Sequence, residues 1–286
     1  MSAARSSSGE SPAGRAALLA VPSLWAVALL VLPMVVLFAM STGSRPEGAG
    51  VRYDGSMEAY DWLAAERGMI GSTAWRSARV AGIATLLSLL LATPVAWWIA
   101  GASPKRRPLW LLLVVLPSWT SFLLRTYAWR FLFGTEGPVN GWLESLSLGS
   151  VRFLNTETAV VVGLVYGYLP FAVLPIYVAV ERLDRDLLAA ARDLGAGPVR
   201  TFASVAFPLT LQGTLAAAAL VFVPSFAAFV TPNVLGGSDT YMIGQLTQER
   251  FLQGRDWPKG AVLGVAIAAA AFLALLPLRR KDPARA

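Results

Sequence analysis

The amino-acid sequence predicts an all-α membrane protein with six transmembrane helices. Hydrophobic residues make up 56% of the chain and charged residues only 14%. The mean hydropathy of +0.57 lies well above that of a soluble domain of this length. Several apolar stretches reach the roughly 20 residues that a helix needs to cross a bilayer. They are residues 16–40, 78–100, 108–133, 159–180, 210–231 and 260–278.

The first stretch is preceded by Arg5 and Arg15, as the apolar segment of a signal peptide would be. It is longer than the usual apolar segment of a signal peptide, and no convincing small-x-small cleavage site follows Met40. We therefore predict an uncleaved first transmembrane helix over residues 16–41. Residues 1–15 are rich in Ser, Gly and Ala and are predicted to be a disordered, cytoplasmic N-terminus.

The positive charges lie beside the apolar stretches. The chain carries a formal net charge of +7, with basic clusters at residues 105–107 and 279–281, directly against two span ends. This distribution argues against nucleic acid as a partner and follows the positive-inside rule. Both termini, including a tail at 279–286, are therefore predicted to be cytoplasmic, in a bacterial plasma (inner) membrane with lipid around the spans.

Residues 42–76 are predicted to form an extracytoplasmic loop. This segment contains several glycines and one proline, followed by a plausibly helical stretch at 57–67. Two interpretations remain open: a surface loop with one interfacial helix, or a docking surface for a partner outside the membrane.

Prolines interrupt most of the predicted spans, and each removes a backbone hydrogen bond that lipid cannot replace. Ordinary kinking and a bundle that bends around a path are both consistent with them. A G-x-x-x-G pattern at Gly163 and Gly167 favours close helix packing. The prolines are Pro33, Pro94, Pro117, Pro170, Pro175 and Pro224.

The sequence lacks several of the residue types that catalytic and metal sites most often use. The chain has no cysteine and no histidine, which excludes thiol nucleophiles, Ser-His-Asp triads, disulfides and Cys/His metal sites. The spans carry no paired carboxylates, and we expect no cofactor. A P-loop is also missing from the sequence, so any ATPase must be another chain. A secondary transporter, the competing class, would carry intramembrane acids and inverted repeats, and we find neither.

The predicted cytoplasmic loop 181–209 has the pattern of two short helices. Asp184 is placed to cap the first helix, Gly195 to stop it and Pro198 to start the second. An amphipathic helix lying in the membrane interface, which needs no partner, is the alternative. The apolar positions on one face of the first helix are Leu187, Leu188, Ala191 and Leu194.

This loop resembles the EAA loop of ABC-importer permeases, E-A-A-x3-G-x9-I-x-L-P. Val205 and Phe207 replace the Ile and Leu of the pattern, and Ala189 stands where Glu is usual. In that family the loop docks into a separate ATPase subunit. The resemblance therefore implies an ATPase-coupling role for Leu187, Leu188, Ala189, Ala190, Ala191, Asp193, Gly195 and Pro208.

Further motifs, between about Ser77 and Leu276, resemble the permeases of spermidine/putrescine importers. That family has a type I ABC importer permease fold, with a core here at 77–278. A pair of ATPase subunits, a second permease and an extracytoplasmic solute-binding protein complete the importer. The motifs are residues 124–129, 163–171, 183–184, 229–232, 235–237, 242–244 and 257–260.

The resemblance implies a polyamine as the solute, but an amino acid, an opine, a phosphonate or ferric ion remains an alternative. Ala228 stands at a position that is often acidic in polyamine-type relatives, and no predicted span contains Asp or Glu. Aromatic side chains near the path could contact a cation, although helix packing or an interfacial belt would also explain them. The candidate path residues are Trp119, Arg125, Tyr127, Trp129, Tyr166, Tyr168 and Phe229.

Overall fold

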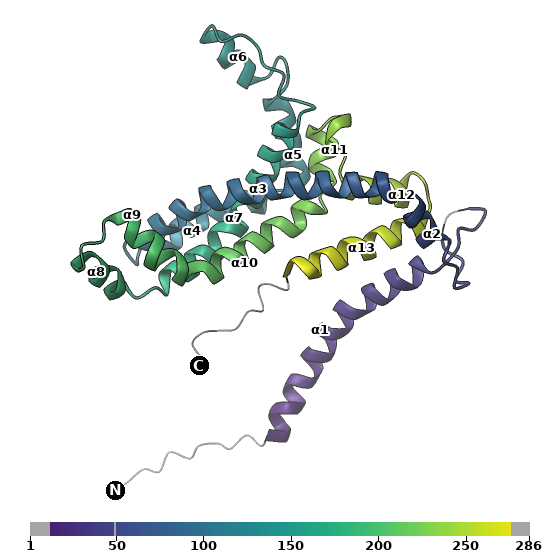
Figure 1. The fold of residues 1–286 in the computed structure, drawn as a ribbon, viewed down its shortest axis with the longest axis horizontal. Helices are drawn as coiled ribbons and strands as arrows, with labels where there is room; N and C mark the ends of the chain where they lie inside the picture. The colour runs from purple at the N-terminus through teal and green to yellow at the C-terminus, as the bar shows by residue number, and fades with distance from the viewer. Residues whose placement is uncertain (1–11, 49, 276–286) are drawn as a thin grey trace.

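The computed structural model describes residues 12–48 and 50–275, and within them the regular structure is helical apart from two isolated β-bridges (Figure 1). Residues 1–11 and the 279–286 tail of the predictions, with the end of the last predicted span, lie outside the described residues. In chain order the helices are α1 (Pro12–Ser41), α2 (Glu58–Ala65), α3 (Arg67–Gly101), α4 (Arg107–Val115), η1 (Leu116–Trp119), α5 (Phe122–Leu132), α6 (Pro138–Ser145), α7 (Glu157–Glu181), α8 (Arg185–Asp193), α9 (Pro198–Thr201), η2 (Phe202–Ala206), α10 (Phe207–Phe226), α11 (Val230–Leu235), η3 (Ser238–Thr240), α12 (Ile243–Leu252) and α13 (Trp257–Leu275).

Five helical segments are long and apolar enough to cross a membrane, and one bent helix pair makes a possible sixth span. The expectation of six apolar segments is thus met in number, with different boundaries. The second membrane-length segment, α3, starts at Arg67, so the end of the predicted 42–76 loop belongs to this helix. The fifth runs from Pro198 to Phe226, where the predicted stretch was 210–231. The helix predicted at 57–67 is found as α2.

The third apolar stretch is not one straight helix. Arg107–Trp119 and Phe122–Leu132 are bent by 85° relative to one another. Pro117 lies in the 3-10 turn η1, and Thr120 then takes an extended backbone with ψ of 153°. Proline cannot donate the backbone hydrogen bond that would continue α4, which explains why the helix tightens and ends here. Of the six prolines within the predicted spans, Pro117 is the one at which a helix ends.

Helices α3, α7 and α10 run side by side and form the core of the bundle. Small residues bring their backbones together: Ala84, Ala92 and Ala96 of α3 are fully buried. A Cβ added at Gly213 of α10 would lie 2.4 Å from the Cβ of Ala179 and 2.7 Å from the carbonyl oxygen of Pro175 in α7. Glycine at this position therefore sets the approach of α7 and α10.

A π-helical turn, η2, joins α9 to α10 within one continuous rod. Thr201, Phe202 and Phe207 all keep right-handed helical backbone angles across it. The second limb predicted for the 181–209 loop is therefore the first turn of the fifth span. Phe202 packs against Trp97 of α3, with ring centroids 5.9 Å apart.

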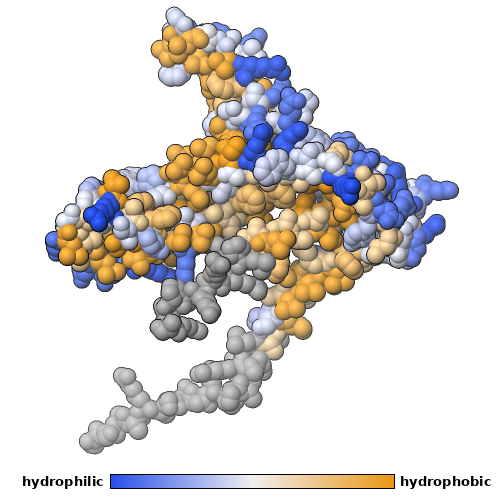
Figure 2. Space-filling view, in the orientation of Figure 1, coloured by the Kyte–Doolittle hydropathy of each residue, from blue (hydrophilic) through white to orange (hydrophobic). Residues whose placement is uncertain are grey.

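The bundle has two different ends (Figure 1). Helices α8 and α9 form one end, while α2 and α12 form the other. Helix α1 diverges from the core and contacts the bundle through α13, where Leu37 lies against Gly264. Helices α5 and α6 form an arm that projects sideways from the core. In Figure 2 hydrophilic residues gather at the α2–α12 end, and hydrophobic residues cover α13 and the adjoining part of α1.

Candidate functional site

Helix α8 starts and stops where the sequence pattern predicts. Asp184 caps it: its Oδ1 accepts the backbone N–H of Asp186 at 2.9 Å, which satisfies one of the free donors of the first turn. Asp186 in the first turn and Arg192 in the last turn also suit the helix dipole. The predicted cap is confirmed.

Gly195 ends α8 in a Schellman motif. The N–H of Ala196 donates to the carbonyl oxygen of Ala191 at 3.1 Å, and the N–H of Gly195 donates to that of Arg192 at 2.8 Å. This arrangement needs a left-handed residue, and Gly195 has a φ of +81°. Its missing side chain matters for the backbone alone, because a Cβ there would meet no atom within 4 Å.

The apolar face of α8 is not covered by this chain. Every residue of α8 is described, and none is buried. Leu187 is 47% exposed, Leu194 just after the helix 89% and Val199 of α9 80%. Ala189, Ala190, Asp193 and Pro208 are exposed, and Leu188 and Ala191 are half-buried. Most of the predicted coupling residues are thus accessible, and most of them lie on α8.

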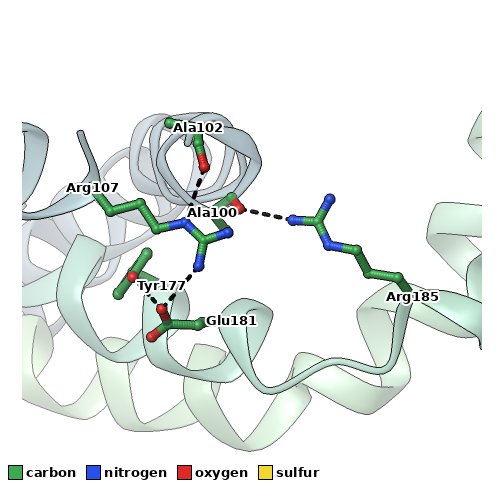
Figure 3. Close-up of polar contacts among 6 residues, drawn as sticks. All are labelled: Ala100, Ala102, Arg107, Tyr177, Glu181 and Arg185. Atoms are coloured by element: carbon green, nitrogen blue, oxygen red, sulfur yellow. Dashed lines mark hydrogen bonds and ion pairs between the residues drawn. The ribbon is translucent and has the colours of Figure 1, made fainter. Parts of the chain in front are cut away.

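Two arginines tie this end together, and sequence reasoning did not single them out for this role (Figure 3). Arg185 at the start of α8 donates from Nη2 to the carbonyl oxygen of Ala100 at 2.8 Å. Arg107 donates from Nε to that of Ala102 at 3.0 Å and from Nη1 to Glu181 at 3.2 Å. Glu181 also accepts the hydroxyl of Tyr177 at 2.6 Å. The basic run at 105–107 signalled membrane orientation, and nothing in the sequence indicates which carbonyl groups these side chains would reach.

Several candidate path residues cluster between α5 and α7. The guanidinium of Arg125 lies 5.9 Å from the ring centroid of Tyr166, and Trp129 packs edge-on against the same ring at 5.4 Å. Phe122 links Arg125, at 5.6 Å, to Tyr168, at 6.1 Å. Phe122 fits there because α7 has Gly167 opposite it, where a Cβ would come within 2.9 Å of its ring.

The other candidates lie outside this cluster. Trp119 is 72% exposed, Tyr127 53% and Phe229 41%, and no ring contact joins them to the cluster within the described chain. Ala228, the position where polyamine-type relatives often have an acid, is 8% exposed and packs in the core with Phe133 and Val160. It therefore does not line an open surface of this chain.

Arg79 is neutralised at the far end of the bundle. It forms an ion pair with Glu157 in the first turn of α7. Arg79 lies within the second predicted span, 78–100, and the ion pair leaves little net charge at this position.

The α2–α12 end is held by a dense polar network. Asp256 is nearly buried and accepts Lys259 Nζ at 3.0 Å, with Arg45 at 4.0 Å. The guanidinium of Arg250 lies 5.0 Å from the ring of Trp62 in α2. Burial, helped by its hydrogen bond to Glu249, raises the pKa of the Tyr241 hydroxyl. These contacts fasten α2 onto α12 and α13.

A single hydrogen bond also shifts the pKa of one exposed carboxyl group at this end. The hydroxyl of Ser44 donates to Asp54 at 2.5 Å and lowers the pKa of that exposed carboxyl.

Among residues 12–48 and 50–275, no group of three or more His, Cys, Asp or Glu could hold a metal ion.

Membrane-length helices around a tight core, with an exposed helix at one end, define a multi-pass membrane protein. The chain belongs to the family of binding-protein-dependent transport system inner membrane components, whose pattern matches residues 16–278. Family membership makes it a transport protein rather than an enzyme, and it removes the secondary-transporter alternative.

The similar proteins agree with that family. The chain is 37% identical over 245 residues to the spermidine/putrescine transport system permease protein PotB of Haemophilus influenzae, covering 85% of each chain. It is 35% identical to the protein of the same name from Escherichia coli, covering 88% of this chain and 92% of that one. A bacterial ABC transporter involved in the import of the acidic polysaccharide alginate shares the fold, with a TM-score of 0.67, 17% identity and 92% of each chain covered. The predicted type I ABC importer permease fold is confirmed.

Proposed function

We propose that this chain is a permease subunit of an ATP-binding-cassette importer for polyamines such as spermidine and putrescine, forming half of the translocation path. One observation carries the proposal: 35% identity over 254 residues, 92% of the relative's length, to a spermidine/putrescine permease. The similarity therefore covers most of both chains.

The uncovered surface of α8 supports a cytoplasmic ATPase as the partner at this end. Leu194 and Val199 are among the most exposed apolar side chains described, and apolar side chains gathered on a helix end indicate a protein contact. The basic run at 105–107 lies in the α3–α4 turn at the same end, which supports a cytoplasmic location by the positive-inside rule. An ATPase pair would then bind the 181–209 loop and its equivalent on a second permease.

The exposed surface of α1 supports burial against lipid or a second permease. The most apolar stretch of Pro22–Ser41 has no residue buried within the described chain. At the opposite end, residues 42–57 and the α2–α12 network form the surface that a solute-binding protein would meet. The tests below assume that residues 1–15 and 279–286 lie on the cytoplasmic side of the membrane and that residues 42–76 lie outside it.

Aromatic rings, rather than carboxylates, would contact the solute in this proposal. Trp129 and Tyr166 offer aromatic faces to an ammonium group, an interaction worth about 0.5–2 kcal/mol. Arg125 already lies over the Tyr166 ring, so a polyamine amine would compete with this guanidinium. The second permease can supply the carboxylates that these spans lack.

Transport would proceed by alternating access. ATP-driven closure of the ATPase pair would move α8 and tilt the core helices, opening one side of the path as the other closes. We infer that the 85° break between η1 and α5 acts as a gate, because its two halves are joined by two non-helical residues, Thr120 and Ser121.

Uptake of labelled putrescine and spermidine tests the substrate. Cells lacking this permease would be compared with cells in which it is restored, with unlabelled amino acids, opines, phosphonates and ferric ion as competitors. Uptake that depends on the chain and is blocked by polyamines alone supports the proposal. Uptake of another solute in place of polyamines would keep the importer and refute the polyamine assignment.

A further inference from the structure

Two arginines donate hydrogen bonds to the carbonyl groups at the C-terminal end of α3. The last carbonyl groups of a helix have no partner within it, and cationic side chains stabilise that end of the helix dipole. Arg185 reaches Ala100 from α8, and Arg107 reaches Ala102 from α4 (Figure 3). One of these donors therefore comes from the helix that the proposed function assigns to ATPase binding.

The second part of the contact is the ion pair between Arg107 and Glu181. Its side chains are 23% and 42% exposed, so solvent screens the pair and it adds little to stability. Glu181 is oriented by Tyr177, one helical turn earlier on α7. The pair thus fixes the position of the α3–α4 turn against the end of α7 while contributing little to folding.

The path of the chain makes these contacts significant. Helix α8 is joined covalently to α7 through residues 182–184 and to α9 and α10 through residues 194–197. It has no covalent neighbour in α3 or α4. Among the described polar contacts, the hydrogen bond from Arg185 is the one that joins α8 to α3. Without it, movement of α8 would reach α3 only through helix packing.

We propose that Arg185, Arg107 and Glu181 form a latch that makes the α3–α4 turn move as one body with α8. The inference rests on the proposed function. In it these three residues are positioning residues: they carry the displacement of α8 by the ATPase into α3, the longest helix of the core. The latch holds in both states of the cycle, so the α8–α3 distance stays constant while the core tilts.

Distance measurements test this directly. The chain has no cysteine, so spin labels can be placed at S103C in the α3–α4 turn and D186C in α8. The assembled importer is measured in lipid nanodiscs without nucleotide and with ATP trapped by vanadate. The latch predicts the same mean distance in both states, and a state-dependent distance after Arg185→Ala. A distance that changes in the unsubstituted protein overturns the proposal, as does one that stays constant in Arg185→Ala.

Coupling efficiency provides the second test. We expect Arg185→Ala to lower the solute moved per ATP hydrolysed about tenfold, within the usual range of coupling between two sites. Arg185→Lys should restore most of it, because an ammonium still donates to a carbonyl. Arg182→Ala is the matched control: Arg182 is exposed and no side-chain hydrogen bond or ion pair is seen for it in the described structure. An unchanged ratio in Arg185→Ala overturns the latch.

A charge swap covers the case in which Arg185→Ala inserts poorly. Arg107→Glu and Glu181→Arg should each lower the ratio, and the double variant should recover it in part, because the ion pair reforms without the bond to Ala102. No recovery in the double variant contradicts the latch. Failure of the proposed substrate gives a different result: the distances report on α8 and α3 whichever solute is carried.

Discussion

The two ends of the bundle are built in opposite ways. At the α2–α12 end, Ile243, Gly244, Gln245 and Leu246 of α12 are buried, and the N–H of Ile243 donates to Ser77 of α3 at 2.8 Å. At the other end all of α8 is described and none of it is buried. The first end is thus held by many contacts within this chain, whereas α8 depends on its local caps and on one hydrogen bond, from Arg185 to the carbonyl oxygen of Ala100. Substitutions should therefore affect folding at one end and function at the other.

The largest effect on stability is expected from Asp256→Ala. Its carboxylate is nearly buried between Lys259 and Arg45, and breaking such a pair costs about 3 kcal/mol because a partly buried cation loses its partner. The melting temperature of the purified protein should fall clearly. Asp54→Ala, an exposed carboxyl in the same region, should change it little. Equal effects would show that burial of the carboxylate does not set the cost of its loss at this end.

Gly244→Ala should be the next most damaging change. A Cβ at Gly244 would lie 2.3 Å from the carbonyl oxygen of Ala227 and 2.5 Å from that of Ala228, so the backbone must shift at a cost of about 2 kcal/mol. Gly71→Ala in α3 meets open space and should be neutral or stabilising, since alanine favours the helix. Thermal unfolding of both variants checks this contrast.

Gly195→Ala should separate the two ends more sharply. The left-handed backbone at Gly195 costs an L-residue about 1–2 kcal/mol, and this strain acts on the Schellman motif rather than on the core. We expect the melting temperature to stay near that of the original protein while uptake falls severalfold. Gly195→Asn, which tolerates this conformation better, should retain more uptake. Full uptake in the alanine variant would refute a coupling role for the loop end.

The smallest effect on folding is expected from Leu194→Ser. Leu194 is 89% exposed, and surface changes of this kind stay within about 0.5 kcal/mol. Co-purification with the ATPase subunits should nevertheless decrease. Leu246→Ser at the opposite end, where the side chain is 3% exposed, should instead destabilise the fold, because a buried apolar side chain is replaced by a hydroxyl group. Undiminished ATPase binding by Leu194→Ser would place the docking surface elsewhere.

The local part of this architecture could be predicted from sequence. Apolar length located the spans, Asp184 and Gly195 predicted both ends of α8, and Gly163 and Gly167 marked a close helix contact. In the structure this contact is with α11 and α5, since a Cβ at Gly163 would meet Leu235 and Thr231 and one at Gly167 would meet Phe122. Each of these signals acts over one or two helical turns, which a single sequence can show.

The rest depends on contacts far apart in the chain. Arg185 and Ala100 are 85 residues apart, and nothing near either residue indicates the pairing. Arg79 and its ion-pair partner Glu157 are likewise 78 residues apart. The bend after Pro117 was missed because proline in a membrane helix more often kinks than breaks it. Pairings and packing directions of this kind require the folded chain.

The π-helical turn η2 (Phe202–Ala206) has a consequence for insertions and deletions. Such a turn completes one revolution with one more residue than an α-helical turn, so a one-residue deletion within 202–206 would leave a regular α-helix with α8 and α9 facing the same way. The same deletion further along α10, where no extra residue is present, would rotate α8 and α9 by about 100° about the axis of α10. The turn η2 is therefore the place in the fifth span where one residue can be lost without changing the direction in which α8 points.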